Sequence, residues 1–252
     1  MSRSLNRVRI AITPSCIGVQ HKGEWHELPA VSVHHRPDLA GLAEQLRSQG
    51  VQGDAEITLS ARVAPTWLLP PPPVRLKQSE MEGWVSDQLA TRFGDLAESW
   101  RLSWDAPAPG EPVLVTAVDL VWFEQLVDAV RSVGITPQRV QPWLSVAYRN
   151  SRHHVQQRDA WLALIEPGQI SLAGFTGGTI NSLRSATFND QADVIEVLTG
   201  MLQREALLAP QITAEHIWIK PVLITADWQR LGISRVHLSP SFKSRLAAMG
   251  DD

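Results

Sequence analysis

The 252-residue sequence is poor in cysteine and has no long apolar segment. Its single cysteine, Cys16, excludes an internal disulfide framework and is typical of a reducing compartment. No apolar run reaches the roughly 18 residues that a membrane helix needs. The first apolar run is short and is interrupted at Pro14, so it fits a buried strand better than a signal peptide.

Neither sign of charge is in large excess. Charged residues make up 19% of the chain and the formal net charge is -3. Nucleic acid is therefore not an expected partner, because its binding relies on a basic surface.

Signatures of catalysis and metal binding are missing as well. The adjacent pairs His34–His35 and His153–His154 have no cysteine or acidic companions at ligand spacing. No G-x-S-x-G elbow is present. The strand-like segments 8–12, 113–118 and 162–165 carry none of the carboxylates that a two-metal nuclease requires. We therefore expect no metal site.

Tryptophan, in contrast, is abundant, with ten residues against one tyrosine. Five of them fall in the middle of the chain: Trp67, Trp84, Trp100, Trp104 and Trp122. Because Trp carries a large apolar area, core packing is the favoured interpretation. A binding groove is the alternative, since Trp is also enriched at interfaces.

Hydrophobic patterning predicts an α/β chain in which one unit occurs twice. Near the start, strands at 7–12, 17–20 and 25–33 precede a helix capped by Asp38 and ended by Gly50. The second unit begins with strands at 160–166, 169–175 and 179–186, followed by a helix from Asp190. Strands at 216–219 and 236–238, with a helix at 226–231 between them, complete it. The polar segment 151–158 is the predicted linker.

The middle of the chain predicts a different unit. Strands at 56–63 and 67–69 and a surface proline run at 70–73 lead to a helix with a capping box of Ser79 and Glu82. A strand at 100–104 follows, and the apolar run 113–118 predicts a strand covered on both faces. Asp119 then caps a helix ended by Gly134, and a strand at 139–140 and a helix at 142–148 come next.

The order of these middle elements, with the phrase VGITPQRV at 133–140, resembles the PilM family of actin-like type IV pilus assembly proteins. It also resembles the cytoplasmic domain of GspL from type II secretion. The resemblance runs from about residue 8 to 238 and depends on order and spacing. It implies an actin-like (RNase-H-like) α/β fold with two halves. Residues 1–56 and 113–150 would form subdomain 1A, 57–112 the inserted 1C, and 159–252 a minimal 2A that lacks 2B.

ATP-binding members of this family carry an Asp-x-Gly turn in the first hairpin. Here Ala11 stands at the acid position and Thr13 at the glycine position. In the second hairpin Glu166 substitutes for the acid if the register shifts, and Gly168 is retained. Mg²⁺ requires carboxylate oxygens, and phosphate requires close approach of the backbone. The resemblance therefore predicts a degenerate actin-like ATPase without a cofactor.

The predicted function is that of a non-catalytic scaffold in a bacterial type IV pilus or type II secretion platform at the inner membrane. The family resemblance implies a PilN-like single-span partner, whose short cytoplasmic segment would be held between 1A and 1C by backbone pairing and side-chain pockets. The secretion or pilus ATPase and a second copy of the chain are further candidate partners. The chain would be cytoplasmic and would reach the membrane only through partners. The groove residues carried over are Ile57, Leu59, Trp67, Leu69, Met81, Val85, Leu89, Val113 and Val115.

The alternative function is a nucleotide- or sugar-phosphate-binding actin-like ATPase or kinase with divergent loops. It needs a carboxylate at the cleft between the halves. Glu166 and Asp159 are the only candidates near the second hairpin.

Overall fold

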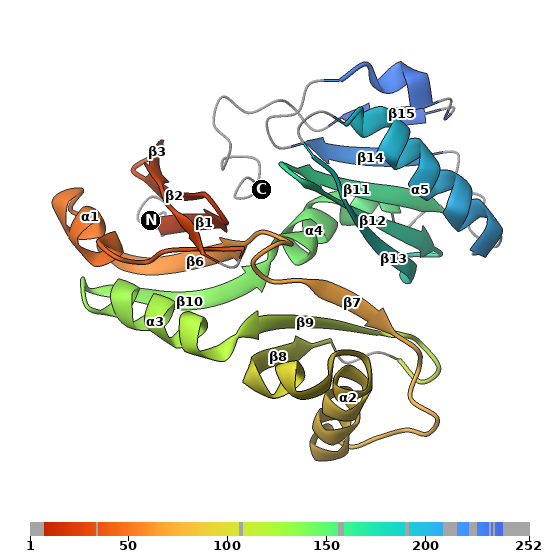
Figure 1. Cartoon of the computed structure of the whole chain (residues 1–252), viewed down its shortest axis with the longest axis horizontal. Coiled ribbons are helices and arrows are strands. Elements are labelled where there is room, and N and C mark those ends of the chain that lie inside the picture. Colours follow the sequence, from red (N-terminus) through yellow and green to blue (C-terminus); the bar gives the residue numbers. More distant parts are fainter. Residues whose placement is uncertain are drawn as a thin grey trace.

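Two five-stranded sheets of the same design dominate the computed structural model, which describes residues 8–33, 35–105, 108–155, 159–189, 192–208, 216–221, 226–231, 233 and 235–238 (Figure 1). The strand orders are β10-β6-β1-β2-β3 and β13-β12-β11-β14-β15. In each sheet three consecutive antiparallel strands are followed by two strands that add in parallel beside the first. The predicted duplication is therefore confirmed.

Each sheet opens with the hairpins that the sequence predicted. The first half has β1 (Val8–Thr13), β2 (Cys16–His21) and β3 (Glu24–Pro29), and the second has β11 (Ala160–Glu166), β12 (Gln169–Thr176) and β13 (Thr179–Thr187). The turns of the second half need residues that tolerate positive φ. Gly168 at +80° and Gly178 at +85° meet that need without steric strain.

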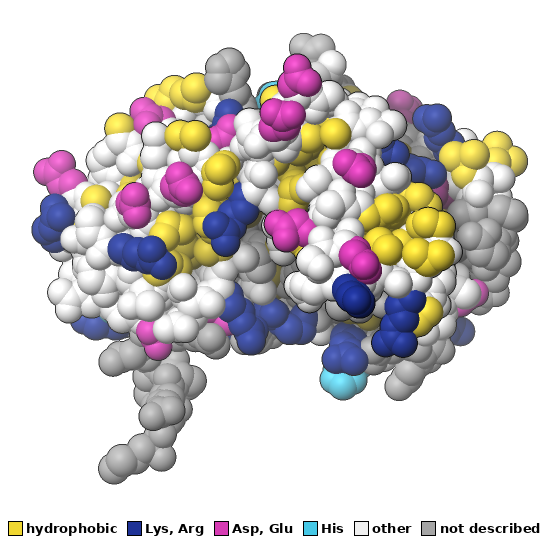
Figure 2. Space-filling view, turned by 90° about the horizontal axis from the view of Figure 1, so that it is seen from below, with side chains coloured by type: hydrophobic (Ala, Val, Ile, Leu, Met, Phe, Trp, Pro, Cys, Tyr) yellow, Lys and Arg dark blue, Asp and Glu magenta, His cyan; other side chains and the backbone are white. Residues whose placement is uncertain are grey.

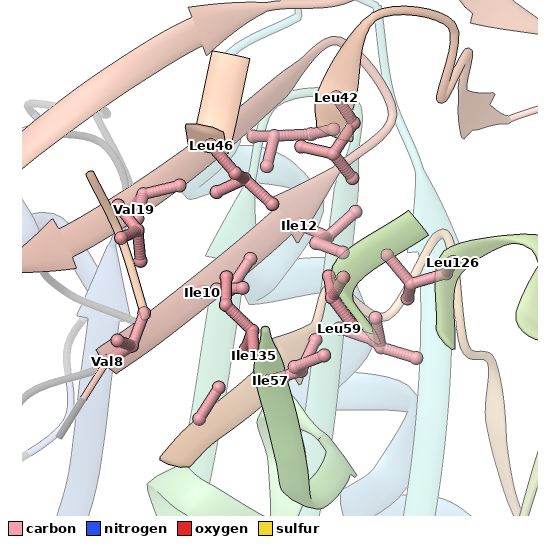
Figure 3. Close-up of a cluster of buried hydrophobic side chains, with 14 of the residues drawn as sticks. Val8, Ile10, Ile12, Val19, Leu42, Leu46, Ile57, Leu59, Leu126 and Ile135 are labelled. Atoms are coloured by element: carbon pink, nitrogen blue, oxygen red, sulfur yellow. The ribbon is translucent and has the colours of Figure 1, made fainter. Parts of the chain in front are cut away.

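The first core lies between the first sheet and two helices, α1 (Leu42–Ser48) and α3 (Leu120–Arg131) (Figure 3). The predicted cap of α3 is confirmed, because the Asp119 carboxylate accepts the Trp122 N–H at 2.8 Å. The predicted cap of α1 is wrong. Asp38 instead accepts the N–H of Ala40, and the helix starts only after Gly41.

A small inserted unit contains the sheet β7-β9-β8 and the helix α2 (Gln78–Phe93). Its strands are β7 (Thr66–Leu69), β8 (Trp100–Trp104) and β9 (Val113–Asp119), and a 3-10 helix, η2 (Gly94–Ser99), follows α2. The capping box is real but begins two residues earlier than predicted. Glu80 accepts the backbone N–H of Lys77 at 2.7 Å, so Ser79 and Glu82 are not the pair.

Two strands belong to different sheets from those predicted. Residues 57–59 end β6 (Gly53–Leu59), which lies between β1 and β10 (Ile135–Pro142) in the first sheet. Conversely, β9 pairs with β7 and β8 of the insertion. The inserted sheet therefore contains residues 113–119 and excludes 57–59.

The helix α4 (Trp143–Val155) joins the two halves into one structure (Figure 1). Its side chains share a core with Ala11 of the first sheet and Leu162 of the second. The predicted linker at 151–158 is wrong in its first part, because 151–155 are helical and Ser151 and Val155 are buried. Residues 156–158 lie outside the described part.

The outer face of the second sheet is covered by α5 (Val194–Leu208) and the 3-10 turn η3 (Trp228–Leu231). The parallel strands β14 (His216–Pro221) and β15 (Arg235–Leu238) complete the sheet, and a two-stranded ribbon of β4 (Ser32–Val33) and β5 (Arg36–Pro37) lies in the first half. The predicted helix start, Asp190, is outside the described residues. Among the helices described, none has the length and apolar character needed to cross a membrane.

Candidate functional site

The carboxyl ends of β1 and β11 meet at one residue, Ser60. Its backbone N–H donates to the carbonyl of Ile12 in β1 at 2.8 Å. Its hydroxyl donates to the carboxylate of Glu166, at the end of β11. These two strand ends belong to the two hairpins that the family resemblance aligns with the nucleotide-binding turns of other members, and which were predicted to be degenerate here. The chain therefore links them directly to each other.

Glu166 is enclosed at this junction, with only 2% of its surface exposed. Burial raises the pKa of Glu166 to about 7, although hydrogen bonds from Ser60 and from the backbone of Ala61 and Arg62, and the charge of Arg62, act in the opposite direction. Its position is thus fixed from the first half of the chain. A carboxylate used in this way does not face a ligand.

Arg62 connects three turns beside Glu166: its own, the turn at Pro167 and the turn at His35. One guanidinium nitrogen donates to the carbonyl of Pro167 at 3.1 Å, and another lies 3.0 Å from Nδ1 of His35. Because arginine stays protonated, Nδ1 of His35 accepts in this pair. A Cβ on Gly168 would lie 3.1 Å from the Arg62 Nη1, so glycine also permits this close approach. We name Ser60, Arg62 and Glu166 the interhalf latch.

The two first-hairpin positions that the family resemblance singled out, Ala11 and Thr13, make their contacts within the chain. Ala11 is buried in the core that contains α4. The Thr13 hydroxyl donates to the carbonyl of Cys16 at 3.0 Å and so closes its own turn. Across the described segments, no three His, Cys, Asp or Glu side chains are grouped as a metal site would require.

A separate pocket of about 340 Å³ opens where the insertion, α4 and the β12–β13 hairpin meet. Its apolar walls come from all three parts, with Leu114 on β9, Leu144 on α4, and Phe175 and Ile180 on the hairpin. Tyr148 stacks on Phe175 with ring centroids 5.2 Å apart, and its hydroxyl donates to the carbonyl of Gly178 at 3.2 Å. We call this the junction pocket.

A second hollow of about 450 Å³ adjoins the junction pocket, because Asp105 lines both. It lies between the proline run after β7 and the end of β8, and Met81 and Trp104 contribute to its wall. We refer to the two hollows together as the groove; they meet at Asp105, at the end of the inserted sheet.

The structure separates the predicted groove residues into two groups. Trp67 and Met81 are half-buried, and Met81 lines the second hollow. The other seven are core residues with at most 3% of their surface exposed: Ile57, Leu59, Leu69, Val85, Leu89, Val113 and Val115. As direct contact residues these seven are a wrong prediction, because their side chains already pack inside the chain. Ile57 and Leu59 are seen in that position in Figure 3.

The tryptophans of the insertion mostly serve packing. Trp67, Phe93 and Trp100 form a cluster with ring centroids 4.9 to 5.6 Å apart. They contact the core beneath α2. Sequence reasoning missed Leu114 and Ile180 in the junction pocket. The available signal was strand alternation, since Leu114 lies between the core residues Val113 and Val115.

No protein-family model and no curated protein sequence matches the chain. Among solved structures, a chain of a PilM-PilN type IV pilus biogenesis complex superposes with a TM-score of 0.68 at 14% identity, over 93% of this chain and 91% of that chain. A Bacteroides thetaiotaomicron protein with an actin-like ATPase fold and unknown function superposes with a TM-score of 0.62 at 10% identity, over 99% of this chain and 98% of that chain. The chain has the actin-like fold.

Another similar structure is the cytoplasmic domain of EpsL, an inner membrane component of the Vibrio cholerae type II secretion system. It gives a TM-score of 0.55 at 12% identity, over 96% of this chain and 92% of that domain. These matches span nearly whole chains, so the actin-like fold includes the insertion and both halves. At such low identity they establish the fold alone.

Proposed function

We propose that this chain is a non-catalytic actin-like scaffold of a pilus or secretion platform at the bacterial inner membrane. In this role it holds the extended cytoplasmic segment of a single-span membrane protein. The observation that carries the proposal is the contrast between two sites. The ends of β1 and β11 are joined to each other by the interhalf latch, whereas the junction pocket is open and mainly apolar.

The division of the groove into two hollows that meet at Asp105 favours an extended segment over a compact nucleotide. The junction pocket and the hollow beside it share Asp105, so a chain in a strand-like conformation can pass from one to the other. Half-buried apolar side chains such as Leu114 and Ile180 would receive its apolar residues. The similar fold of a PilM-PilN complex and of the EpsL cytoplasmic domain supports the same role. Such a scaffold would be cytoplasmic and peripheral to the membrane.

Magnesium-ATP is expected not to bind the purified chain. Ala11 and Thr13 supply neither a carboxylate nor glycine, and Glu166 is held by the first half. Isothermal titration with 1:1 Mg-ATP should therefore give no heat above dilution, in contrast to a nucleotide-binding actin-like protein measured in parallel. Saturable binding would contradict the non-catalytic scaffold.

Replacing Ile180 by asparagine is expected to weaken binding of the partner segment about tenfold or more, because burying an Ile side chain contributes roughly 1.5–3 kcal/mol. The probe is a labelled peptide that covers the cytoplasmic segment of the single-span membrane protein encoded beside this chain, and fluorescence anisotropy gives Kd. The matched control is Val121→Asn, because Val121 is 63% exposed on α3 and does not line the groove. Equal affinities of both variants would place the binding site elsewhere.

A further inference from the structure

The junction pocket is lined by two acidic side chains and, among the residues that the structure describes, by no basic one. Its lining includes the carboxylates of Asp105 and Glu111, and no Lys, Arg or His. Within the residues that the structure describes, neither carboxylate forms an ion pair. The rest of the lining is mainly apolar, so the two charges stand out at its rim.

Both carboxylates are fixed in place. The N–H of Leu114 donates to Oδ1 of Asp105 at 2.8 Å. Glu111 accepts from the N–H of Ala108 at 3.1 Å and from the Thr179 hydroxyl at 3.3 Å. Thr179 belongs to β13, so Glu111 bridges the insertion and the second half. The two charges therefore keep their positions relative to the apolar wall.

The electrostatic environment of Asp105 favours an incoming cation. Although the residue is exposed as a whole, its carboxyl group is partly enclosed, and this desolvation raises its pKa. The negative charge of Glu111 raises that pKa further, while hydrogen bonds from backbone N–H groups lower it. A cation placed between the two carboxylates would relieve their repulsion.

We propose that the junction pocket selects a lysine or arginine side chain next to apolar residues of the partner segment. This inference depends on the proposed function and specifies the chemistry of its partner. The aliphatic stem of such a side chain would lie on Leu114 and Ile180, with its charged end at Asp105 and Glu111. A bare metal ion fits less well, since only two of the lining residues are carboxylates and the walls are apolar.

The decisive test combines two forms of the chain with two forms of the peptide. The double variant Asp105→Asn/Glu111→Gln keeps the shape and one acceptor oxygen of each side chain but removes both charges. The probe is the peptide described above, together with a version in which its Lys and Arg residues are replaced by norleucine. The control is Glu82→Gln/Asp87→Asn, which removes two exposed charges from α2.

We expect the double variant to bind the basic peptide about tenfold more weakly and the neutral peptide with unchanged affinity, because a pair of partly enclosed charges is lost only in the first case. Wild-type affinity for the basic peptide should rise as pH rises through the Asp105 pKa, and the control should match wild type. If the double variant binds the basic peptide as tightly as wild type does, or loses the same affinity for both peptides, the charge selection is overturned. If Ile180→Asn abolishes binding while the double variant does not, the scaffold function stands and the charge selection fails. If neither peptide binds wild type, both fail.

Discussion

Replacing Glu166 by alanine is expected to lower the free energy of unfolding by about 3 kcal/mol at pH 5 and to loosen the two halves from each other. The substitution leaves the Ser60 hydroxyl and the N–H of Ala61 without their acceptor, whereas the N–H of Arg62 keeps the Ser60 Oγ at 3.2 Å. Each buried donor left unpaired costs about 1–3 kcal/mol. Chemical denaturation measures the stability, and hydrogen exchange at residues 60–62 and 166–168 measures the loosening.

The raised pKa of Glu166 also predicts that the stability of the chain depends on pH. The folded chain binds a proton at Glu166 up to a pKa of about 7, whereas an unfolded glutamate releases it near 4.5. The folded state therefore holds more protons between these values, and its stability falls as pH rises from 5 to 8. The free energy of unfolding lost in this way is up to about 3 kcal/mol for a pKa shift of this size.

Comparison with Glu166→Ala isolates the contribution of Glu166 from that of the other groups in the chain. The variant should show a flatter stability profile than wild type between pH 5 and 8, so the cost of the substitution shrinks toward pH 8. Glu82→Ala, an exposed glutamate on α2, serves as the control and should keep the wild-type slope. A variant that keeps the full slope would show that Glu166 is not the titrating group.

The predictable part of this fold was the part governed by local chemistry. Apolar runs separated by Pro167–Gly168 and Gly177–Gly178 gave the three strands of the second half almost to the residue. The cap at Asp119 was also predictable, because its carboxylate contacts the N–H three residues ahead. Where two glutamates lie within the same turn, local rules do not decide which of them forms the cap. Glu80, not Glu82, reaches back to the start of α2.

The groove was harder to predict because it depends on which sheet each strand joins. Apolarity alone selects Val113 and Val115, and these point into the core beneath α2. Leu114 points the other way and lines the junction pocket, together with side chains from α4 and β13 that lie far away in the sequence. The polar composition of residues 151–158 likewise favoured a linker over the end of α4, since Val155 is a core residue among polar neighbours.

The mixed character of the surface also explains why a docking site is hard to predict from composition. Figure 2 shows a side of the molecule on which apolar side chains form separate groups, with basic and acidic side chains between them. No charge of one sign dominates this side, in line with the net charge of -3. Recognition in a groove therefore depends on a few placed groups rather than on a broad field.

Replacing Trp143 by alanine is expected to destabilise both halves at once, by about 3–5 kcal/mol. Trp143 is fully buried at the start of α4, in a core that includes Ala11 from the first sheet and Leu162 and Phe175 from the second. The cavity left by the indole would therefore border both sheets. Hydrogen exchange should show loss of protection in β1 and β11 together.

The matched control is Trp84→Ala, since Trp84 is half-buried against the core beneath α2. Its loss should reduce protection in the inserted sheet and leave β1 and β11 as in wild type. If Trp143→Ala instead exposed only one of the two sheets, α4 would not couple the halves. A coupled core fits the proposed scaffold, because a partner held in the junction pocket would contact α4 and both flanking parts, and its binding energy would then stabilise the whole chain.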